Sequence, residues 1–203
     1  MSNKPIIVFE GIEGTGKSHH IGKVANFLRK KNKKFIQIRE PGGSKNSEKI
    51  RKLILNNKAT FNKYTDLLLY LSARSENIEL IKKNIGKKII LIDRFSDSTI
   101  AYQHYGMGID LKFITNINDF LLRGINIDFT FLNTVNQKNM KNRLVKRNNL
   151  NRYDKFNKSF YHNVQKGFIK ILRKKPKKYM HVDSNLSINH NEKIILNKIN
   201  DLI

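Results

Sequence analysis

The chain has 203 residues, with 40 lysines and arginines against 16 aspartates and glutamates, so its formal net charge is +24. It has no cysteine, which excludes disulfides, thiolate metal sites and cysteine nucleophiles. No stretch reaches the length of a membrane span, and the N-terminus lacks the basic-then-apolar pattern of a signal peptide. We therefore expect a single α/β domain over residues 1–203, located in the cytoplasm and not in a membrane.

The positive charge is spread along the chain and is not gathered beside aromatic residues that could stack on bases. Basic runs recur as "RKKNKK", "IKKNIGKK" and "LRKKPKK", mixed with many asparagine and isoleucine residues. This spreading favours a compositional bias toward Lys, Asn and Ile on solvated helix faces over a surface built for polyanions. We therefore expect no nucleic-acid partner, although the positive field would speed the arrival of anionic nucleotides.

The first predicted strand, "PIIVFE" at residues 5–10, leads directly into a glycine-rich loop. Gly11 to Ser18 reads G-x-x-x-x-G-K-S, the spacing of a phosphate loop, and apolar residues at helical spacing follow it. Glycines let successive backbone N–H groups turn inward around an anion, and the next helix directs its positive dipole end at the same point. We expect Lys17 to contact the terminal phosphates and the Ser18 hydroxyl to ligate Mg²⁺. A chance glycine-rich turn is the alternative, and the predicted ATP-binding residues are Gly11, Ile12, Glu13, Gly14, Thr15, Gly16, Lys17 and Ser18.

Further strands alternate with helical patterns along the chain, at Phe35 to Arg39, Lys88 to Asp93, Asp128 to Leu132 and Lys178 to Asp183. With the first strand they predict an α/β fold of the phosphate-loop NTPase type, a parallel five-stranded sheet with helices on both faces. In such folds, ligands bind beyond the C-terminal ends of the strands. The residues at those ends are therefore the candidate site residues.

Three charged residues stand at predicted strand ends, where they would face the phosphate loop. Asp93 closes a buried strand and is placed to hold Mg²⁺ directly or through water, with a helix N-cap as the alternative. Arg39 and Arg94 carry planar donor groups that suit phosphate oxygens, and a surface ion pair is the alternative for either. A hydrolase needs only one phosphate loop, a metal and a water-positioning group. The extra arginines therefore indicate a second phosphate-bearing substrate and phosphoryl transfer.

The segment "KRNNLNRYDKFNK", residues 146–158, is polar and shows little apolar periodicity. It predicts a short mobile lid between two helices. Closure of such a lid would exclude water that would otherwise hydrolyse ATP. A solvated basic loop is the alternative.

Five short motifs follow one another along the chain. They are "EGIEGTGKS" at residues 10–18, "REPGG" at 39–43, "SAR" at 72–74, "DRFSDSTIAYQ" at 93–103 and "GMGID" at 106–110. Their order and approximate spacing resemble the thymidylate kinase family, and the likeness continues through "NRYD" and "VQKGF" over nearly the whole chain. The resemblance implies transfer of a phosphoryl group from ATP to dTMP, giving dTDP and ADP, and a homodimer held through helices.

The resemblance also implies roles around the sugar and phosphate of dTMP. Glu13 would contact the 3′-hydroxyl, while Arg39 and Arg94 would grip the phosphate. Asp93 would belong to the metal and phosphate network. Together with Lys17, Asp93 and Arg94 are the catalytic candidates at the strand ends.

Around the base, the resemblance implies that Tyr70 stacks on thymine and that Arg74 donates to a thymine carbonyl. Tyr102 would pack near C2′ of the sugar, where a ribose hydroxyl has no room. Without the family pattern, both tyrosines would be interpreted as core aromatics on helices. The residues expected to line the base side of the pocket are Ser98, Thr99 and Gln103.

Some thymidylate kinases carry an arginine inside the phosphate loop, after the acidic residue, where this sequence has Gly14. Members with that gap are expected to supply the missing cation from the lid, which here offers Lys146, Arg147 and Arg152. Arg152 is the first catalytic candidate because it lies in the "NRYD" segment that matches the family, and Arg147 is the second.

Two positions depart from the family pattern. His19 stands where the family usually repeats a hydroxyl residue, and we expect it to tune packing or adenine-side contacts. In "FLNTV", Thr134 stands where the family has an aspartate, so the family pattern does not predict the local structure at this strand end.

The residues leave two other functions to be weighed. The first is a different nucleotide-phosphorylating enzyme of the same fold, another phosphate-loop nucleotide kinase or a deoxynucleoside kinase, and a screen of acceptors would decide. A basic ATP-dependent nucleic-acid-binding protein, favoured only by the charge of +24, would show salt-sensitive binding and nucleic-acid-stimulated ATPase activity.

Overall fold

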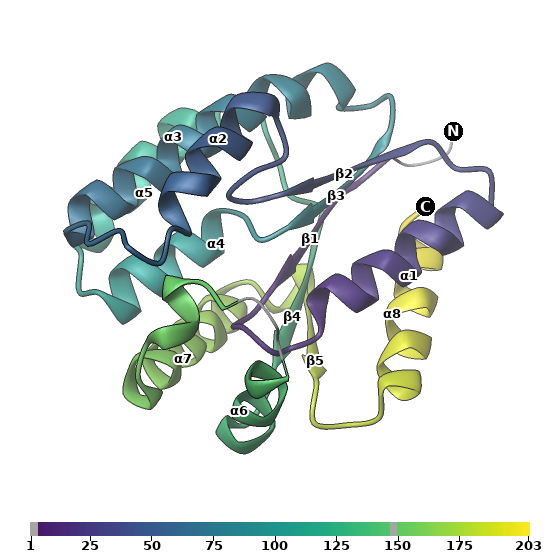
Figure 1. Ribbon diagram of the computed structural model, residues 1–203. Coiled ribbons are helices and arrows are strands. Elements are labelled where there is room, and N and C mark those ends of the chain that lie inside the picture. The colour runs from purple at the N-terminus through teal and green to yellow at the C-terminus, as the bar shows by residue number, and fades with distance from the viewer. Residues whose placement is uncertain (1–3, 147–149) are drawn as a thin grey trace.

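A parallel sheet of five strands forms the centre of the molecule (Figure 1). The computed structural model describes residues 4–146 and 150–203. Hydrogen-bonded neighbours follow the order β2-β3-β1-β4-β5, and each pair is parallel. The predicted fold class is confirmed, and β4 ends at Thr134 rather than at Leu132. The strands are β1 (Ile6–Glu10), β2 (Phe35–Arg39), β3 (Ile89–Asp93), β4 (Phe129–Thr134) and β5 (Tyr179–Asp183).

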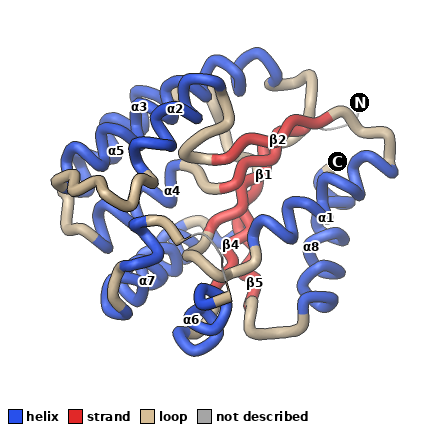
Figure 2. The backbone as a smooth tube through the Cα atoms, viewed as in Figure 1, coloured by secondary structure: helices blue, strands red, loops and turns tan. Residues whose placement is uncertain are grey.

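Helices cover both faces of the sheet (Figures 1 and 2). On one face, α1 (Lys17–Lys30) packs beside α8 (Ile188–Leu202). The other face carries α3 (Lys63–Asn84), α5 (Leu111–Leu121) and α7 (Lys158–Lys174). No helix in the described part of the chain is long and apolar enough to cross a membrane, and the cytoplasmic location stays a prediction. The shorter helical segments are α2 (Lys45–Ile54), α4 (Ser96–Thr99), a π-helix (Ile100–Gly106), α6 (Gln137–Val145) and two 3-10 turns (Arg152–Lys155 and Pro176–Lys178).

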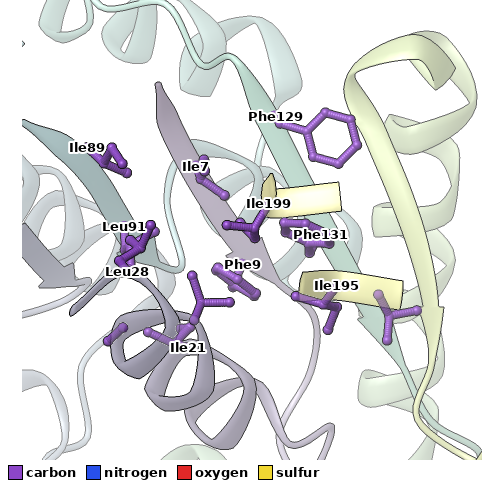
Figure 3. Packing of buried hydrophobic residues seen from close by; sticks show 13 residues of the cluster. Ile7, Phe9, Ile21, Leu28, Ile89, Leu91, Phe129, Phe131, Ile195 and Ile199 are labelled. Carbon is purple, nitrogen blue, oxygen red and sulfur yellow. The ribbon is translucent and has the colours of Figure 1, made fainter. Parts of the chain in front are cut away.

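The central strand β1 is buried along its whole length and alternates between two hydrophobic clusters. Ile7 and Phe9 pack with side chains of α1 and α8 (Figure 3). Ile6 and Val8 face the opposite side, where α3 covers them. Because both faces are covered, a continuous apolar run is the pattern expected for this strand. β1 is therefore a rigid support for the loop of residues 11–18, which follows Glu10.

The longer helices begin at residues whose side chains satisfy backbone N–H groups, as is usual at helix N-termini. α1 is different. Its N-cap residue is Gly16, which has φ 80° and no side chain that could accept a hydrogen bond from the first turn. The first N–H groups of α1 are therefore not capped by a protein side chain and can serve an anion. The capping residues of α2, α3, α5, α6, α7 and α8 are, in that order, Ser44, Asn62, Asp110, Asn136, Asn157 and Ser187.

The predicted lid segment lies between α6 and α7. Its residues 147–149, which include the candidate Arg147, lie outside the described residues. In the remainder, Arg152–Lys155 forms a 3-10 turn whose Tyr153 is buried in a hydrophobic cluster with α7. This half of the segment packs against the body of the protein through an aromatic residue. Its movement as a lid stays a prediction.

Candidate active site

A cavity of about 490 Å³ opens at the C-terminal ends of the strands. The phosphate loop, β2, β3, α3 and the π-helix all contribute to its wall, as expected if the strand ends face one crevice. Arg152, Gly11 and Ile12 are not among the residues that line it. The predicted site residues that do line it are Glu13, Gly14, Thr15, Gly16, Lys17, Ser18, Arg39, Tyr70, Arg74, Asp93, Arg94, Ser98, Thr99, Tyr102 and Gln103.

The phosphate loop is pressed against the end of β4. Gly11 has φ 134°, and a Cβ built on it would lie 2.1 Å from the carbonyl oxygen of Asn133. No larger residue fits there without moving one of the two strands. The approach of the two backbones fixes where the loop leaves the sheet.

Lys17 lies folded onto the loop that precedes it. Its Nζ donates to the carbonyl oxygens of Gly11 and Ile12, each at 2.8 Å, and to Thr15 Oγ1 at 3.2 Å. Burial of the amine, helped by the positive charge of Arg94, lowers the pKa of Lys17 to about 7. Phosphate oxygens arriving at the loop would compete with these carbonyls and favour the charged amine.

Ser18 and Asp93, the predicted ligands of Mg²⁺, meet across the crevice. The Ser18 hydroxyl donates to Oδ2 of Asp93 at 3.5 Å, which is a weak hydrogen bond. Among the described residues there is no cluster of three or more carboxylates, histidines or cysteines that could hold a metal by itself. A hydroxyl and one carboxylate fit Mg²⁺, which keeps several waters and takes further oxygens from substrate phosphates.

Arg94 connects the phosphate loop to Tyr102 of the π-helix. Its guanidinium donates to Gly11 O at 2.7 Å and to Glu13 Oε1 at 2.9 Å, and lies 5.3 Å from the ring centre of Tyr102. The Tyr102 hydroxyl donates to the other Glu13 oxygen at 2.5 Å. Arg94 has φ 65°, a conformation unusual for a residue with a side chain. Glu13, Arg94 and Tyr102 therefore hold one another in place between the two halves of the site.

A second cationic group stands at the end of β2. Arg39 donates to both carboxylate oxygens of Glu48 on α2, at 3.1 and 2.9 Å, and these hydrogen bonds raise its pKa. Arg51 of α2 donates to Pro41 O at 2.6 Å and lines the same cavity. Arg51 was not singled out from the sequence, because nothing in the local pattern of α2 separates it from the neighbouring surface lysines.

The wall of the cavity formed by α3, α4 and the π-helix contains polar groups of two kinds. Arg74 is fully engaged by the protein, with Nε and Nη2 on Glu40 Oε2 at 2.9 and 2.8 Å and Nη1 on Asn118 Oδ1 at 2.6 Å. By contrast, Thr99 Oγ1 and Gln103 Nε2 are buried and have no hydrogen-bond partner. Buried polar atoms are normally satisfied, so these two atoms are unusual, and both residues line the cavity.

Two tyrosines complete that wall. Tyr70 meets Tyr153 edge to face, with ring centres 5.8 Å apart, and Tyr102 meets Tyr153 at 6.0 Å. Burial raises the pKa of Tyr70 to about 12, so its hydroxyl stays neutral. Both rings pack as core aromatics do and also line the cavity, so the two interpretations of these residues are compatible.

Comparison with known proteins identifies the family of this chain. A family model described as thymidylate kinase matches residues 9–195. The thymidylate kinase of Thermosipho africanus (strain TCF52B) is 38% identical over 169 residues, covering 82% of this chain and 84% of that protein. The thymidylate kinase of Acholeplasma laidlawii (strain PG-8A) is 36% identical over 198 residues, covering 95% and 97%. The chain belongs to the thymidylate kinase family.

The fold agrees with a solved member of the same family. The crystal structure of thymidylate kinase from Ehrlichia chaffeensis superimposes with a TM-score of 0.78 at 29% identity, covering 97% of this chain and 98% of that one. The resemblance carried by the five motifs is therefore confirmed, and the protein is a nucleotide-binding kinase with thymidylate kinase activity. The family match favours a thymidylate kinase over the deoxynucleoside kinase and nucleic-acid-binding alternatives.

In this thymidylate kinase, the lid arginine expected to complete the phosphate loop is occupied elsewhere. The guanidinium of Arg152 is paired with the buried carboxylate of Asp66 on α3 and also donates to Ile54 O. The Tyr153 hydroxyl donates to the same carboxylate. These contacts explain why Arg152 does not line the cavity, and its catalytic role stays a prediction.

A different arginine, which the sequence analysis did not select, contacts the loop at the expected gap. Arg143, on α6, donates to Gly14 O at 2.9 Å and to Ser184 O at 2.7 Å, and it lines the cavity. The sequence carries no local signal for this contact, because Arg143 lies among other polar residues of α6, and Gly14 is 129 residues away.

The two departures from the family pattern have defined surroundings. His19 lines the thymidylate kinase cavity, and its Nε2 lies 2.6 Å from Glu192 Oε1 of α8. Thr134 Oγ1 lies 2.7 Å from His181 Nε2 on the neighbouring strand. Asn133, one residue earlier, is fully buried under the loop, and its side-chain amide has no partner.

Proposed function

We propose that the enzyme transfers the γ-phosphoryl group of ATP, bound on the loop of residues 11–18, to the phosphate of dTMP bound beyond β3. The observation that carries this assignment is that the phosphate loop and two arginines beyond it, Arg39 and Arg94, line one cavity. Thr99 and Gln103 line it as well, and their Oγ1 and Nε2 atoms have no hydrogen-bond partner in the protein. A base that paired with these atoms would be favoured over acceptors that leave them unpaired.

A coupled assay of ADP release tests the acceptor directly. The acceptors are dTMP, dUMP, dGMP, dCMP and thymidine, each with ATP and Mg²⁺. We expect dTMP to give the highest kcat/KM and thymidine to give no activity. Equal or greater activity with thymidine would instead support a nucleoside kinase.

The proposed mechanism needs no covalent intermediate, because phosphoryl transfer is catalysed mainly by alignment and by positive charge around the migrating group. Lys17 and the loop N–H groups would bind the phosphates of ATP, and Arg39 and Arg94 would hold the phosphate of the acceptor. Ser18 and Asp93 would hold Mg²⁺, directly or through water, and the metal would supply positive charge to the phosphates of ATP. The cavity wall would keep water from the reacting groups.

At the sugar, we propose that Glu13 accepts a hydrogen bond from the 3′-hydroxyl of dTMP. Its carboxylate is already oriented by Arg94 and by the Tyr102 hydroxyl, which supports this role. The Tyr102 ring would occupy the space beside C2′. Arg74, held between Glu40 and Asn118, would donate a hydrogen bond to a thymine carbonyl.

For the cation missing from the phosphate loop, we propose Arg143, because it already contacts the backbone of Gly14. Arg152 stays the candidate from the sequence, and for this role its guanidinium would have to leave Asp66. Kinetics of variants at the two positions separate these candidates, as set out in the Discussion.

We also propose a homodimer that pairs through α3 and α5. These two helices pack against each other, and each exposes large apolar side chains: Tyr64 and Leu68 on α3, Phe113 and Phe120 on α5. Exposed apolar groups of this kind favour a protein partner. Light scattering during size-exclusion chromatography of the wild type and of Leu68→Glu tests the proposal, with a dimer mass expected for the first and a monomer mass for the second.

A further inference from the structure

The last residue of β1, Glu10, is a buried acid outside the roles described so far. It has no exposed surface. Its Oε1 accepts hydrogen bonds from the backbone N–H groups of Phe95 at 2.8 Å and Ser98 at 3.2 Å. Its Oε2 lies 2.5 Å from Ser98 Oγ. The carboxyl therefore caps the turn that begins α4, although it is 85 residues away in sequence from Phe95.

This cap lies where the two halves of the site meet. The carbonyl oxygen of the next residue, Gly11, accepts from Lys17 on the ATP side and from Arg94 on the acceptor side. The turn held by Glu10 lies between Arg94 and Thr99, which both line the cavity. A shift of this turn would move the acceptor groups relative to the phosphate loop.

We propose that Glu10 is a positioning residue for the acceptor: its neutral carboxyl fixes the Phe95–Ser98 turn, and with it Arg94 and Thr99, at the required distance from the phosphate loop. Glu10 itself touches neither substrate. It acts through the turn, by hydrogen bonds that a neutral acid or an amide can make and an alkyl group cannot.

The surroundings of Glu10 favour the neutral form. No ion pair to Glu10 occurs among the residues that the structure describes. Glu10 ends the fully buried strand β1 and lies against the first turn of α4. Burial first, and then the negative charge of Asp97, raises the pKa of Glu10 to about 8, against the opposing hydrogen bonds and Arg94. The neutral form would donate from Oε2 to Ser98 Oγ and still accept two N–H groups at Oε1. The charged and titratable groups that face it are Asp97, Arg94, Lys17 and Tyr179.

Asp97 is itself held in place. It accepts a hydrogen bond at 2.5 Å from the hydroxyl of Tyr179, at the start of β5. Ionisation of Glu10 would therefore place a second negative charge beside a fixed one. The expected result is a displaced turn and weaker binding of the acceptor above the pKa of Glu10.

The test compares Glu10→Ala and Glu10→Gln with the wild type, and uses Glu79→Gln, an exposed acid on α3, as the control. At pH 7 and saturating ATP, Glu10→Ala should raise KM for dTMP at least tenfold. Its affinity for a non-hydrolysable ATP analogue, measured alone by calorimetry, should stay within threefold of the wild type. Glu10→Gln should restore KM to within threefold, because the amide reproduces the hydrogen bonds of the neutral acid.

A pH profile supplies the readout that a purely structural role would not move. Between pH 7 and 9, KM for dTMP should rise in the wild type and in Glu79→Gln more steeply than in Glu10→Gln, which has no proton to lose at this position. The proposal is overturned if Glu10→Gln is as impaired as Glu10→Ala at pH 7, or if its profile follows that of the wild type. If Glu10→Ala does not fold, the pH dependence of KM for dTMP in Glu10→Gln, compared with that of the wild type, tests the proposal by itself.

The inference rests on dTMP as the acceptor, and the wild-type control separates the two hypotheses. A wild-type enzyme that does not phosphorylate dTMP would refute the proposed function. An active wild type together with an unaltered KM in Glu10→Ala would refute only the role of Glu10.

Discussion

The hydroxyl of Tyr102 donates to Glu13 at 2.5 Å, so the residue proposed to exclude a 2′-hydroxyl also orients the residue proposed to bind the 3′-hydroxyl. Two substitutions separate these functions. Tyr102→Phe keeps the ring and removes the hydrogen bond, so it should weaken dTMP binding without relaxing sugar discrimination. Tyr102→Ala opens space beside C2′ and should relax discrimination by roughly 1–3 kcal/mol.

The measurement is the ratio of kcat/KM for dTMP to that for ribothymidine monophosphate. An unchanged ratio in Tyr102→Ala would leave Tyr102 as a core aromatic only. A ratio that falls equally in Tyr102→Phe would assign the discrimination to the hydroxyl instead of the ring.

Lys17→Ala should nearly abolish transfer while leaving dTMP binding largely intact. Lys17 contacts the phosphate loop, and the acceptor is proposed to bind across the crevice beside Arg94. Calorimetric titration of dTMP into the folded variant is the test. Loss of dTMP affinity there would contradict the proposed division between the ATP side and the acceptor side.

ATP binding should take up protons in alkaline solution. The pKa of Lys17 is lowered to about 7, so the amine is mostly neutral at pH 8 and charged at pH 6. Because phosphate favours the charged form, binding of ATP should draw a proton at pH 8 and almost none at pH 6. Calorimetry in buffers of different ionisation enthalpy measures this uptake, and Lys17→Met is the matched control without the amine. Equal uptake by the control would assign the proton to another group.

Arg143→Ala and Arg152→Ala should fail in different ways. Arg143→Ala should lower kcat at least tenfold, a barrier change of about 1.4 kcal/mol, with dTMP affinity little changed. Arg152→Ala leaves Asp66 buried without its cation, which should lower the free energy of unfolding by about 3 kcal/mol. Kinetics and thermal unfolding of both variants distinguish the roles. A kcat within threefold of wild type in Arg143→Ala, with a large loss in a stable Arg152→Ala, would return the catalytic role to Arg152.

Glu10→Gln should stabilise the protein at neutral and higher pH. The folded-state pKa of Glu10 is raised to about 8 from an ordinary value of 4.5, so between these values the folded protein holds a proton that the unfolded chain releases. The stability of the wild type therefore falls as pH rises through this window, and the amide has no such dependence. Thermal unfolding should give a higher Tm for Glu10→Gln at pH 8 and a difference that shrinks toward pH 5. A constant difference across this range would contradict a neutral Glu10.

Local pattern was sufficient for most of the fold. β1 and the phosphate loop were predicted because a continuous apolar run and a fixed glycine spacing are properties of neighbouring residues. The convergence of Arg39 and Asp93 followed from one rule about parallel strands, and the two residues are paired in register. Contacts between segments that are distant in sequence could not be predicted in this way.

Arg143, Arg51 and Asp66 show why the rest could not be predicted. Arg143 reaches Gly14 across 129 residues, and its sequence neighbours form an ordinary polar helix. Asp66 is the only acid in the first turn of α3 and reads as a helix-start residue, yet it is almost fully buried by the lid segment. An exposed charged residue and a buried one have the same neighbours in sequence when the segment that covers the buried one is distant along the chain.

The cations at the strand ends already have partners supplied by the protein. Glu48 holds Arg39, Glu13 holds Arg94, and two backbone carbonyls hold Lys17. Entry of phosphate groups at Arg39 would therefore be an exchange of one counter-anion for another, and it would leave the Glu48 carboxylate with its hydrogen bond from the Gly43 N–H. Because such an exchange changes the local charge less than binding to a bare cation does, dTMP affinity should depend only weakly on ionic strength, despite the overall charge of +24.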